Sequence, residues 1–399
     1  MNAPPRPHPS RGTILLLGSL TAFGAVTIDL YLPALPAIGR DFGVGPAETQ
    51  HTLVAFFMGV AIGQLFYGPI SDRIGRRPPL LFGVALYIAA SLACTFATGI
   101  NGLIAGRFVQ ALGCCSGMVI ARSVVRDRFD HQDSARIFSL LTLVLAVAPM
   151  IAPTLGGWLV MVAGWRWVFG ALAMIGAAVG LATFLKLGES RSAETEAKAR
   201  GETPLAAYVD LMRQRRLLGY LLTGALNGAT LFAYVASAPD LVINIWGLSP
   251  TLFGLVFAVM AIGIIGASQV NRQLLLRYSS DRILGTAVLA GVGFGAALTL
   301  AAATGAHRWV VFVMLFATLS SNGFIGANAL AGALSVDPLR SGSASGLFGA
   351  SSFGAGAGSA AVAGAFHDGT PVPMAVVMLA SLAAAAAAFF GLARPRTAS

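Results

Sequence analysis

The sequence predicts an all-α membrane protein with twelve transmembrane helices in two six-helix halves. The 399 residues are 56% hydrophobic and only 11% charged. Soluble domains carry about 25% charged residues, so this chain could not cover a water-exposed surface with polar side chains. Apolar runs long enough to cross the hydrocarbon core as helices recur along the chain. The longest polar interruption, residues 186–216, divides these runs into two sets of six.

Twelve apolar runs separated by short polar loops are the expected spans. Their approximate cores are 13–33, 51–70, 78–98, 102–122, 135–160, 165–185, 217–238, 250–270, 283–303, 308–333, 343–365 and 372–393. The sequence therefore divides into a cytoplasmic lead, an N-terminal half, a cytoplasmic linker, a C-terminal half and a cytoplasmic tail: 1–12, 13–185, 186–216, 217–393 and 394–399. Two of these runs differ in composition from the others: the fifth contains Pro149 and Pro153, and the eleventh is rich in Gly, Ser and Ala.

The distribution of basic residues predicts the orientation. The net charge is +10, and 22 of the 26 Lys and Arg residues fall on one alternating set of segments that includes both termini. By the positive-inside rule, these segments and both termini face the cytoplasm. We therefore interpret the basic excess as an orientation signal toward anionic cytoplasmic lipid, and expect no nucleic-acid partner.

A dense charge cluster follows the second apolar run and forms a predicted cytoplasmic loop. Residues 51–67 before it and 78–106 after it contain no Asp, Glu, Lys or Arg, which is typical of two membrane helices joined by a hairpin. The arginines are sufficient to set topology, whereas the aspartate and the glycines contribute nothing to it. The residues of interest in this loop are Gly68, Asp72, Arg73, Gly75, Arg76 and Arg77.

Asp29 is the one acidic residue clearly inside an apolar run, and Arg107 is the one basic residue there. Charged side chains inside a membrane face the protein interior or water, and usually pair. The simplest arrangement places Asp29 near Arg107 at a central cavity. A conformational change that moves the arginine or admits water would then change the protonation of Asp29 and act as a proton switch. The alternative is a fixed ion pair that holds two helices together.

Polar and aromatic side chains within the spans are candidates for a substrate cavity. Asn227 and Tyr234 are seven residues apart and share one face of a helix. The alternative for each candidate is an interhelical hydrogen bond or core packing. The full set is Tyr31, Phe57, Gln110, Asn227, Tyr234, Asn322 and Asn328. The three cysteines lie in apolar spans without metal-ligand spacing and no nucleotide-binding motif is found, so we expect no metal and no cofactor.

Several segments resemble the major facilitator superfamily, specifically its bicyclomycin- and chloramphenicol-resistance (Bcr/CflA) branch of drug:proton antiporters. In the N-terminal half they are Asp29 to Pro36, the charged loop at 68–77, Arg107 to Gly113 and Ala148 to Gly157; in the C-terminal half they are Asn271 to Arg277 and Asn328 to Gly346. The resemblance covers nearly the whole chain apart from the linker and the termini. It implies two halves that rock around a midplane cavity to give alternating access.

The resemblance also implies roles for individual residues. Asp72 resembles an aspartate that caps a helix of the opposite half in the outward-facing state, and Arg76 would link Asp72 to Asp127 as a conformational latch. The fifth run resembles an antiporter motif, although Ala152 replaces its usual glycine. The motif positions that remain are Pro149, Pro153, Gly156 and Gly157.

The leading hypothesis is a monomeric, proton-coupled multidrug exporter whose substrates are amphipathic antibiotics similar to phenicols or bicyclomycin. Asp29 would carry the proton and Arg107 would tune it. An alternative is a proton-coupled carrier of a natural metabolite such as a small peptide, purine or sugar. A membrane enzyme is a third possibility, but the five histidines are scattered rather than clustered with Asp or Ser near one face. We therefore expect a transporter and not an enzyme.

Overall fold

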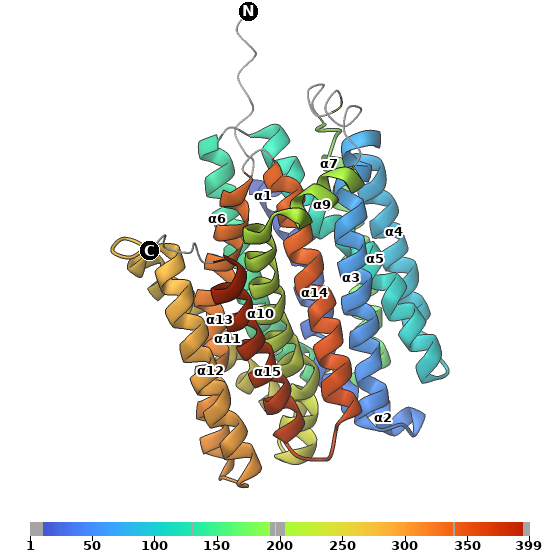
Figure 1. Cartoon of the computed structure of the whole chain (residues 1–399). Coiled ribbons are helices and arrows are strands. Elements are labelled where there is room, and N and C mark those ends of the chain that lie inside the picture. Colours follow the sequence, from blue (N-terminus) through green and yellow to red (C-terminus); the bar gives the residue numbers. More distant parts are fainter. Residues whose placement is uncertain (1–10, 130, 192–195, 197–203, 338–339, 394–399) are drawn as a thin grey trace, which may run out of the picture.

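The computed structural model describes residues 11–129, 131–191, 196, 204–337 and 340–393 (Figure 1). Every regular element in these ranges is helical. Most of the predicted lead (1–12) and the whole predicted tail (394–399) lie outside the described residues, as does part of the predicted linker (186–216).

Eleven segments of the described chain are helical, long and apolar enough to cross a membrane. The first segment is Gly12–Phe42, which contains α1 (Arg11–Asp29) and α2 (Leu35–Phe42), and the seventh is Arg215–Ile245, which contains α10 (Arg215–Pro239). Eight of the other nine contain α3 (Pro46–Ile74), α4 (Arg77–Thr95), α5 (Ile100–Arg128), α7 (Arg166–Lys186), α11 (Pro250–Leu274), α12 (Ser280–Ala303), α13 (Arg308–Val336) and α15 (Val372–Ala388), and the ninth, Leu143–Ala163, is part of α6 (His131–Ala163).

Helix α14 (Ser341–Ala365) corresponds to the eleventh expected span, which the eleven segments above leave out. Its many glycines and serines lower its mean hydropathy, which explains why it does not stand out as an apolar run. It packs against α3 on one side and α10 on the other, as Figure 1 shows. The predicted fold class, an all-α membrane bundle, is confirmed.

The helices pack in two groups joined along two seams. In the first group α5 packs against α1, α3 and α4, and in the second α10 packs against α13, α14 and α15. The seams between the groups are α3 against α14 and α6 against α11. The exact boundaries of the halves, 13–185 and 217–393, stay predictions.

Two spans differ from the sequence-based expectation. The first is not one continuous helix, because α1 ends at Asp29 and a short 3₁₀ turn (Leu32–Ala34) leads into α2. Pro33 in this turn lacks an N–H group and so cannot continue the α-helical ladder. The seventh span is longer than 217–238, because α10 continues through a π-helical turn, η2 (Asp240–Ile245). By contrast α6 runs without interruption through Pro149 and Pro153.

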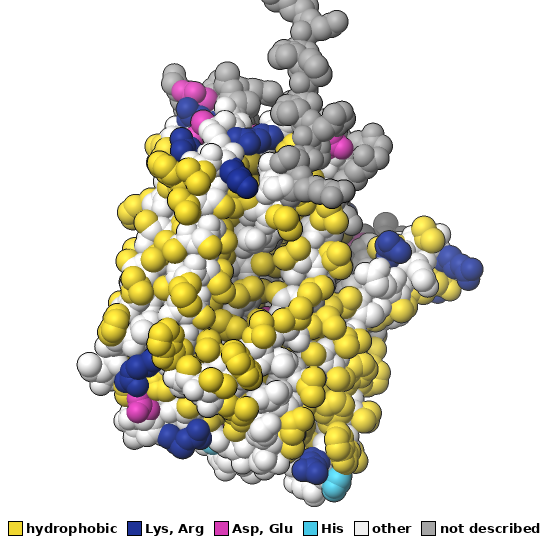
Figure 2. All heavy atoms as spheres, turned by 180° about the vertical axis from the view of Figure 1, so that it is seen from behind, with side chains coloured by type: hydrophobic (Ala, Val, Ile, Leu, Met, Phe, Trp, Pro, Cys, Tyr) yellow, Lys and Arg dark blue, Asp and Glu magenta, His cyan; other side chains and the backbone are white. Residues whose placement is uncertain are grey.

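The outer surface is apolar around the middle of the molecule. Figure 2 shows hydrophobic side chains over this region, with arginines, acidic side chains and histidine gathered toward the ends and on one lateral projection. Phe82, Trp158 and Leu300 are among the large apolar side chains left exposed. This distribution is typical of a protein whose solvent is lipid.

Candidate functional site

Asp29 is the last residue of α1, at the point where the first span breaks. Its side chain is 5% exposed, and its Oδ2 atom has no hydrogen-bond partner. It lies close enough to Tyr234, on α10 of the other helix group, for an electrostatic interaction. The acid therefore sits where the two groups of helices meet.

Arg107 is fully buried on α5, and its guanidinium lies among aromatic rings. The guanidinium carbon is 4.3 Å from the ring centre of Tyr31, 4.2 Å from that of Phe56 and 5.8 Å from that of Phe169. Its Nη1 atom donates to Gln110 Oε1 at 2.7 Å. The Nε and Nη2 atoms of Arg107 have no hydrogen-bond partner. Cation–π contacts and one hydrogen bond thus replace a counter-ion.

The expected pairing of Asp29 with Arg107 is not observed. No salt bridge joins these two described side chains: Tyr31 and Gln110 contact the guanidinium within the first helix group, whereas Asp29 interacts electrostatically with Tyr234. The fixed ion pair considered as an alternative is therefore not formed. The Tyr31 hydroxyl is hydrogen-bonded to Thr52 at 2.7 Å, which fixes the ring beneath Arg107.

Three candidate cavity residues of the second helix group are buried with a polar atom unpartnered. They are Asn227 (Oδ1) and Tyr234 (hydroxyl) on α10, and Asn322 (Oδ1) on α13. Together with Asp29 and Arg107, they bring unsatisfied polar groups of both helix groups into the interior. Buried polar groups are nearly always hydrogen-bonded, so this set requires a ligand, a proton or water to complete it.

Phe57 and Asn328 occupy different surroundings from the other candidates. The Phe57 ring packs at a tilt against Phe232 of α10, with ring centres 4.4 Å apart, and also lies near Phe353 of α14, so it packs in the seam between the helix groups. Asn328 donates to Asn271 Oδ1 at 2.7 Å and accepts from Ser280 at 2.8 Å. Asn328 therefore joins α11, α12 and α13 by hydrogen bonds, which is the interhelical alternative considered for each candidate in the sequence analysis.

The charged segment predicted as a loop is mostly helical, because residues 68–74 belong to α3, Arg77 begins α4, and only Gly75 and Arg76 lie between the two helices. We keep the name charged loop for residues 68–77. Its side chains form a network within the first helix group. Arg76 donates to Asp72, to Ser71 Oγ at 2.8 Å and to Asp127 Oδ2 at 2.8 Å. The link from Asp72 through Arg76 to Asp127 is thus present in the structure. Arg77 contacts the end of α7 by donating to the Phe184 carbonyl at 2.9 Å.

Glu189, which the sequence did not single out, anchors the same loop. Its carboxylate accepts from the backbone N–H groups of Arg76 and Arg77 at 2.9 and 3.1 Å. Partial burial opposes its ionisation, but hydrogen bonds from the backbone N–H groups of Arg76, Arg191, Arg77 and Ser190 outweigh that cost and lower the pKa of Glu189. Arg191 also donates to the carbonyl of Arg73. The only sequence signal for this anchor is an acid placed directly after the sixth span.

Gly75, which follows the last residue of α3, and Gly68, which lies within α3, have different structural roles. Gly75 has φ +100°, a conformation that other residues rarely adopt, and a Cβ atom there would lie 2.6 Å from Glu189 Oε2. At Gly68 the nearest atom to such a Cβ is 4.0 Å away, so packing does not require glycine.

The motif glycines of α6 allow very close contacts with backbone. A Cβ atom at Gly156 would lie 2.1 Å from the carbonyl oxygen of Leu30, directly after Asp29. A Cβ atom at Gly157 would lie 2.4 Å from the carbonyl oxygen of Pro250, at the start of α11. These adjacent glycines therefore let α6 press on the break in the first span and on the other helix group.

Sequence reasoning also missed a polar pair at the opposite end of the bundle. His367 Nε2 lies 2.7 Å from Asp240 Oδ2, and Asn244 donates to Asp240 Oδ1 at 2.7 Å. The predicted seventh span ends at residue 238, so Asp240 is assigned to a loop. A span predicted to extend further would have included Asp240 as a second acid within an apolar segment.

The lipid-facing bundle, with unpartnered polar groups of both helix groups in its interior, defines a multi-pass membrane transporter. Residues 15–361 match the Major Facilitator Superfamily, and the chain belongs to this superfamily. The superfamily consists of transporters, which confirms the expectation that the protein is not an enzyme and acts on small molecules.

Curated relatives agree with the branch expected from the sequence. The chain is 33% identical to "Uncharacterized MFS-type transporter YdgK" of Bacillus subtilis, covering 96% of this chain and 95% of the relative. It is 29% identical to "Bicyclomycin resistance protein homolog" of Haemophilus influenzae, with 95% of each chain covered. It is 32% identical to "Multidrug resistance protein MdtL" of Escherichia coli K12, with 59% of each covered. These names are consistent with a drug transporter of the Bcr/CflA type.

Solved structures show the same fold at low sequence identity. A bacterial homologue of the lysosomal transporter Spinster, in an inward-facing conformation, matches with a TM-score of 0.73, 17% identity and 95% coverage of both chains. The D-xylose–proton symporter matches with a TM-score of 0.73 and 12% identity, covering 96% of this chain and 97% of that one.

Proposed function

We propose that this protein is a proton-coupled antiporter that exports amphipathic antibiotics, such as phenicol- or bicyclomycin-like compounds, from the bacterial cytoplasm. It acts as a monomer in the inner membrane with both termini in the cytoplasm. The names of the curated relatives support drug export. The apolar surface band and the basic charge distribution support the membrane orientation.

The observation that carries this proposal is the set of unpartnered polar groups in the interior. Asp29 and Arg107 come from one helix group, and Asn227, Tyr234 and Asn322 come from the other. Ligand sites in transporters of this architecture lie near the midplane, between the repeats. A moderately polar drug would satisfy these atoms with its own donors and acceptors, while the aromatic rings contact its apolar parts.

The position of Asp29 supports a role as the proton carrier. It ends α1 without a counter-ion, and its neighbour Tyr234 belongs to the opposite helix group. A rocking motion between the groups therefore changes the surroundings of the carboxyl. Arg107 stays caged by Tyr31 and Phe56 and supplies a fixed positive charge within the first helix group. Protonation and drug binding would then be linked through the same interior space.

The loop network supports a conformational latch. Arg76 joins Asp72 to Asp127 at the end of α5. The α14 helix of the other group begins nearby, because a Cβ atom at Gly342 would lie 3.9 Å from Arg126. Breaking the network would favour the inward-facing state.

The test is a susceptibility panel in a drug-hypersensitive bacterium that expresses the chain. We expect wild-type protein to raise resistance to at least one phenicol or to bicyclomycin, and Asp29→Asn and Arg107→Ala to abolish this resistance at equal expression. Asp368→Asn is the matched control, because this exposed acid bonds to Thr370 and lies outside the interior. Unchanged susceptibility across phenicols, bicyclomycin and dyes would favour a metabolite carrier.

Proton coupling is tested separately in inverted membrane vesicles. Addition of a transported drug should drive proton movement through wild-type protein and not through Asp29→Asn. Full coupling in Asp29→Asn would exclude Asp29 as the proton carrier, whatever the panel shows.

A further inference from the structure

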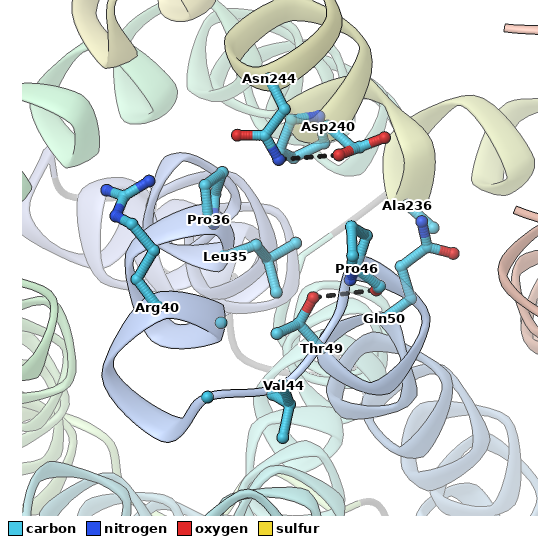
Figure 3. Close-up of a pocket in the computed structure, with 13 residues that line it drawn as sticks. Leu35, Pro36, Arg40, Val44, Pro46, Thr49, Gln50, Ala236, Asp240 and Asn244 are labelled. Atoms are coloured by element: carbon cyan, nitrogen blue, oxygen red, sulfur yellow. Dashed lines mark hydrogen bonds between the residues drawn. The ribbon is translucent and has the colours of Figure 1, made fainter. Parts of the chain in front are cut away.

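A pocket of about 360 Å³ lies between the two helix groups, at the end of the bundle away from the charged loop. One wall is formed by α2 and the start of α3, and the facing wall by the end of α10 with η2 (Figure 3). Its volume is within the range of about 300–1,000 Å³ found for small-molecule sites. The interior groups proposed to bind drugs and protons do not line it.

The walls carry one charge of each sign. Of the described residues that line the pocket, only Arg40 and Asp240 are charged, and Figure 3 shows them on different walls. Leu35, Pro36 and Pro239 supply apolar surface between them. This lining matches a molecule of amino-acid size that has a cationic end, an anionic end and an apolar body.

The Asp240 carboxylate is held in place but retains binding capacity. It is 9% exposed, with one oxygen hydrogen-bonded to Asn244 and the other to His367. An ionised carboxylate has about four acceptor positions, so two stay free for a ligand ammonium group. On the opposite wall Arg40 is exposed and forms no described salt bridge, which leaves its guanidinium available to a carboxylate.

Two polar side chains of α3 also line this pocket. Gln50 is 3% exposed, and its Oε1 atom lies against α14, because a Cβ atom at Gly364 would be 2.7 Å from it. The neighbouring Thr49 hydroxyl donates to the carbonyl of Pro46. Recognition of a ligand therefore depends on the two charged side chains.

We propose that this pocket is a second binding site, specific for small zwitterions of amino-acid or dipeptide size, with the ammonium group at Asp240 and the carboxylate at Arg40. The site is separate from the interior polar groups, and its occupancy does not depend on the transport function proposed above. Because its walls belong to different helix groups, a bound zwitterion joins the two groups at this end of the molecule.

The test measures binding to the full chain in detergent, by calorimetry, without a proton gradient. The ligands are leucine, phenylalanine and alanyl-alanine, compared with N-acetylphenylalanine, which lacks the cationic end, and phenylalaninamide, which lacks the anionic end. We expect saturable binding of at least one zwitterion, and binding of the corresponding blocked forms to be about tenfold weaker or worse. This comparison uses only wild-type protein and so does not depend on whether variants fold.

Variants then locate the site. Asp240→Asn and Arg40→Gln should each weaken zwitterion binding about tenfold or more, whereas the exposed Asp368→Asn and Arg308→Gln should not change it. Asp29→Asn should also leave binding unchanged. Absence of saturable binding by all three zwitterions, equal binding of the blocked forms, or loss of binding in Asp29→Asn with retention in Asp240→Asn would each overturn the proposal.

Discussion

The interior polar groups and the charged loop differ in how their charges are compensated. In the loop, Arg76 is paired with Asp72 and Asp127, and Glu189 accepts several backbone N–H groups. In the interior, Arg107 has aromatic rings and one amide instead of a carboxylate, and Asp29 has no salt-bridge partner among the described residues. Ion pairing of this kind is typical of a structural element, whereas buried charge without a counter-ion is typical of a functional one.

The same substitution at the two arginines should separate these roles most strongly. Arg76→Met leaves Asp72 and the buried Asp127 unpaired, and should lower the free energy of unfolding by about 3 kcal/mol. Arg107→Met removes a buried charge that has no counter-ion, and should change stability by less than about 1 kcal/mol while drug efflux is lost. Thermal unfolding in detergent and efflux assays on both variants check this prediction.

A large loss of stability in Arg107→Met, equal to that in Arg76→Met, would mean that the aromatic cage is mainly structural. The comparison between interior and loop would then fail.

Two asparagines on α13 give the next largest contrast. Asn328 bonds to Asn271 and Ser280, so Asn328→Ala leaves those partners unsatisfied and should lower the free energy of unfolding by about 2 kcal/mol. Asn322 has an unpartnered oxygen, so Asn322→Ala should alter drug affinity with little loss of stability. Denaturant unfolding and drug binding measured on both proteins would show opposite patterns; matching patterns would remove Asn322 from the cavity.

The two loop glycines test whether the charged loop depends on its backbone shape. Gly75→Ala forces a Cβ atom into a left-handed conformation against Glu189, and should cost about 1.5 kcal/mol. Gly68→Ala adds a methyl group where the nearest atom is 4.0 Å away, and should be nearly neutral. Melting temperatures of the two variants give the comparison, and equal values would contradict it.

Glu189 should give the smallest effect, and one that depends on pH. Its pKa is lower in the folded protein than the usual 4.5, so its contribution is complete above that value and is lost as the pH falls through the lowered pKa. Glu189→Gln should therefore reduce stability by about 1 kcal/mol at neutral pH and by less under acid conditions. Unfolding midpoints measured from pH 7 to pH 3 should converge, and a constant difference would argue against the ionised carboxylate as the anchor.

Periodicity and composition were sufficient to predict the bundle, because membrane spans follow directly from apolar length. Apolar length alone located neither the break after Asp29, which Pro33 marks in the sequence, nor the extension of α10 through the π-helical turn at Asp240. Single residues such as Asp29 and Arg107 could be identified by their charge alone. Their partners could not, since an aromatic cage around Arg107 has no linear sequence pattern.

The same limit explains the outcome for the polar candidates. Asn322 and Asn328 look alike in sequence, and only the positions of Asn271 and Ser280 show that one is satisfied and the other is not. Glu189 was missed because its partners are main-chain N–H groups, which every sequence has.

The adjacent glycines of α6 have a mechanical consequence. Gly156 rests on the carbonyl of Leu30, one residue after the intramembrane acid, while Gly157 rests on the carbonyl of Pro250 in the other helix group. Two adjacent residues of α6 thus contact both the other helix group and the segment that follows the acid. A tilt that moves α11 away from α6 would also alter the packing beside Asp29, so the proposed proton carrier would respond to the relative movement of the two helix groups through main-chain contacts.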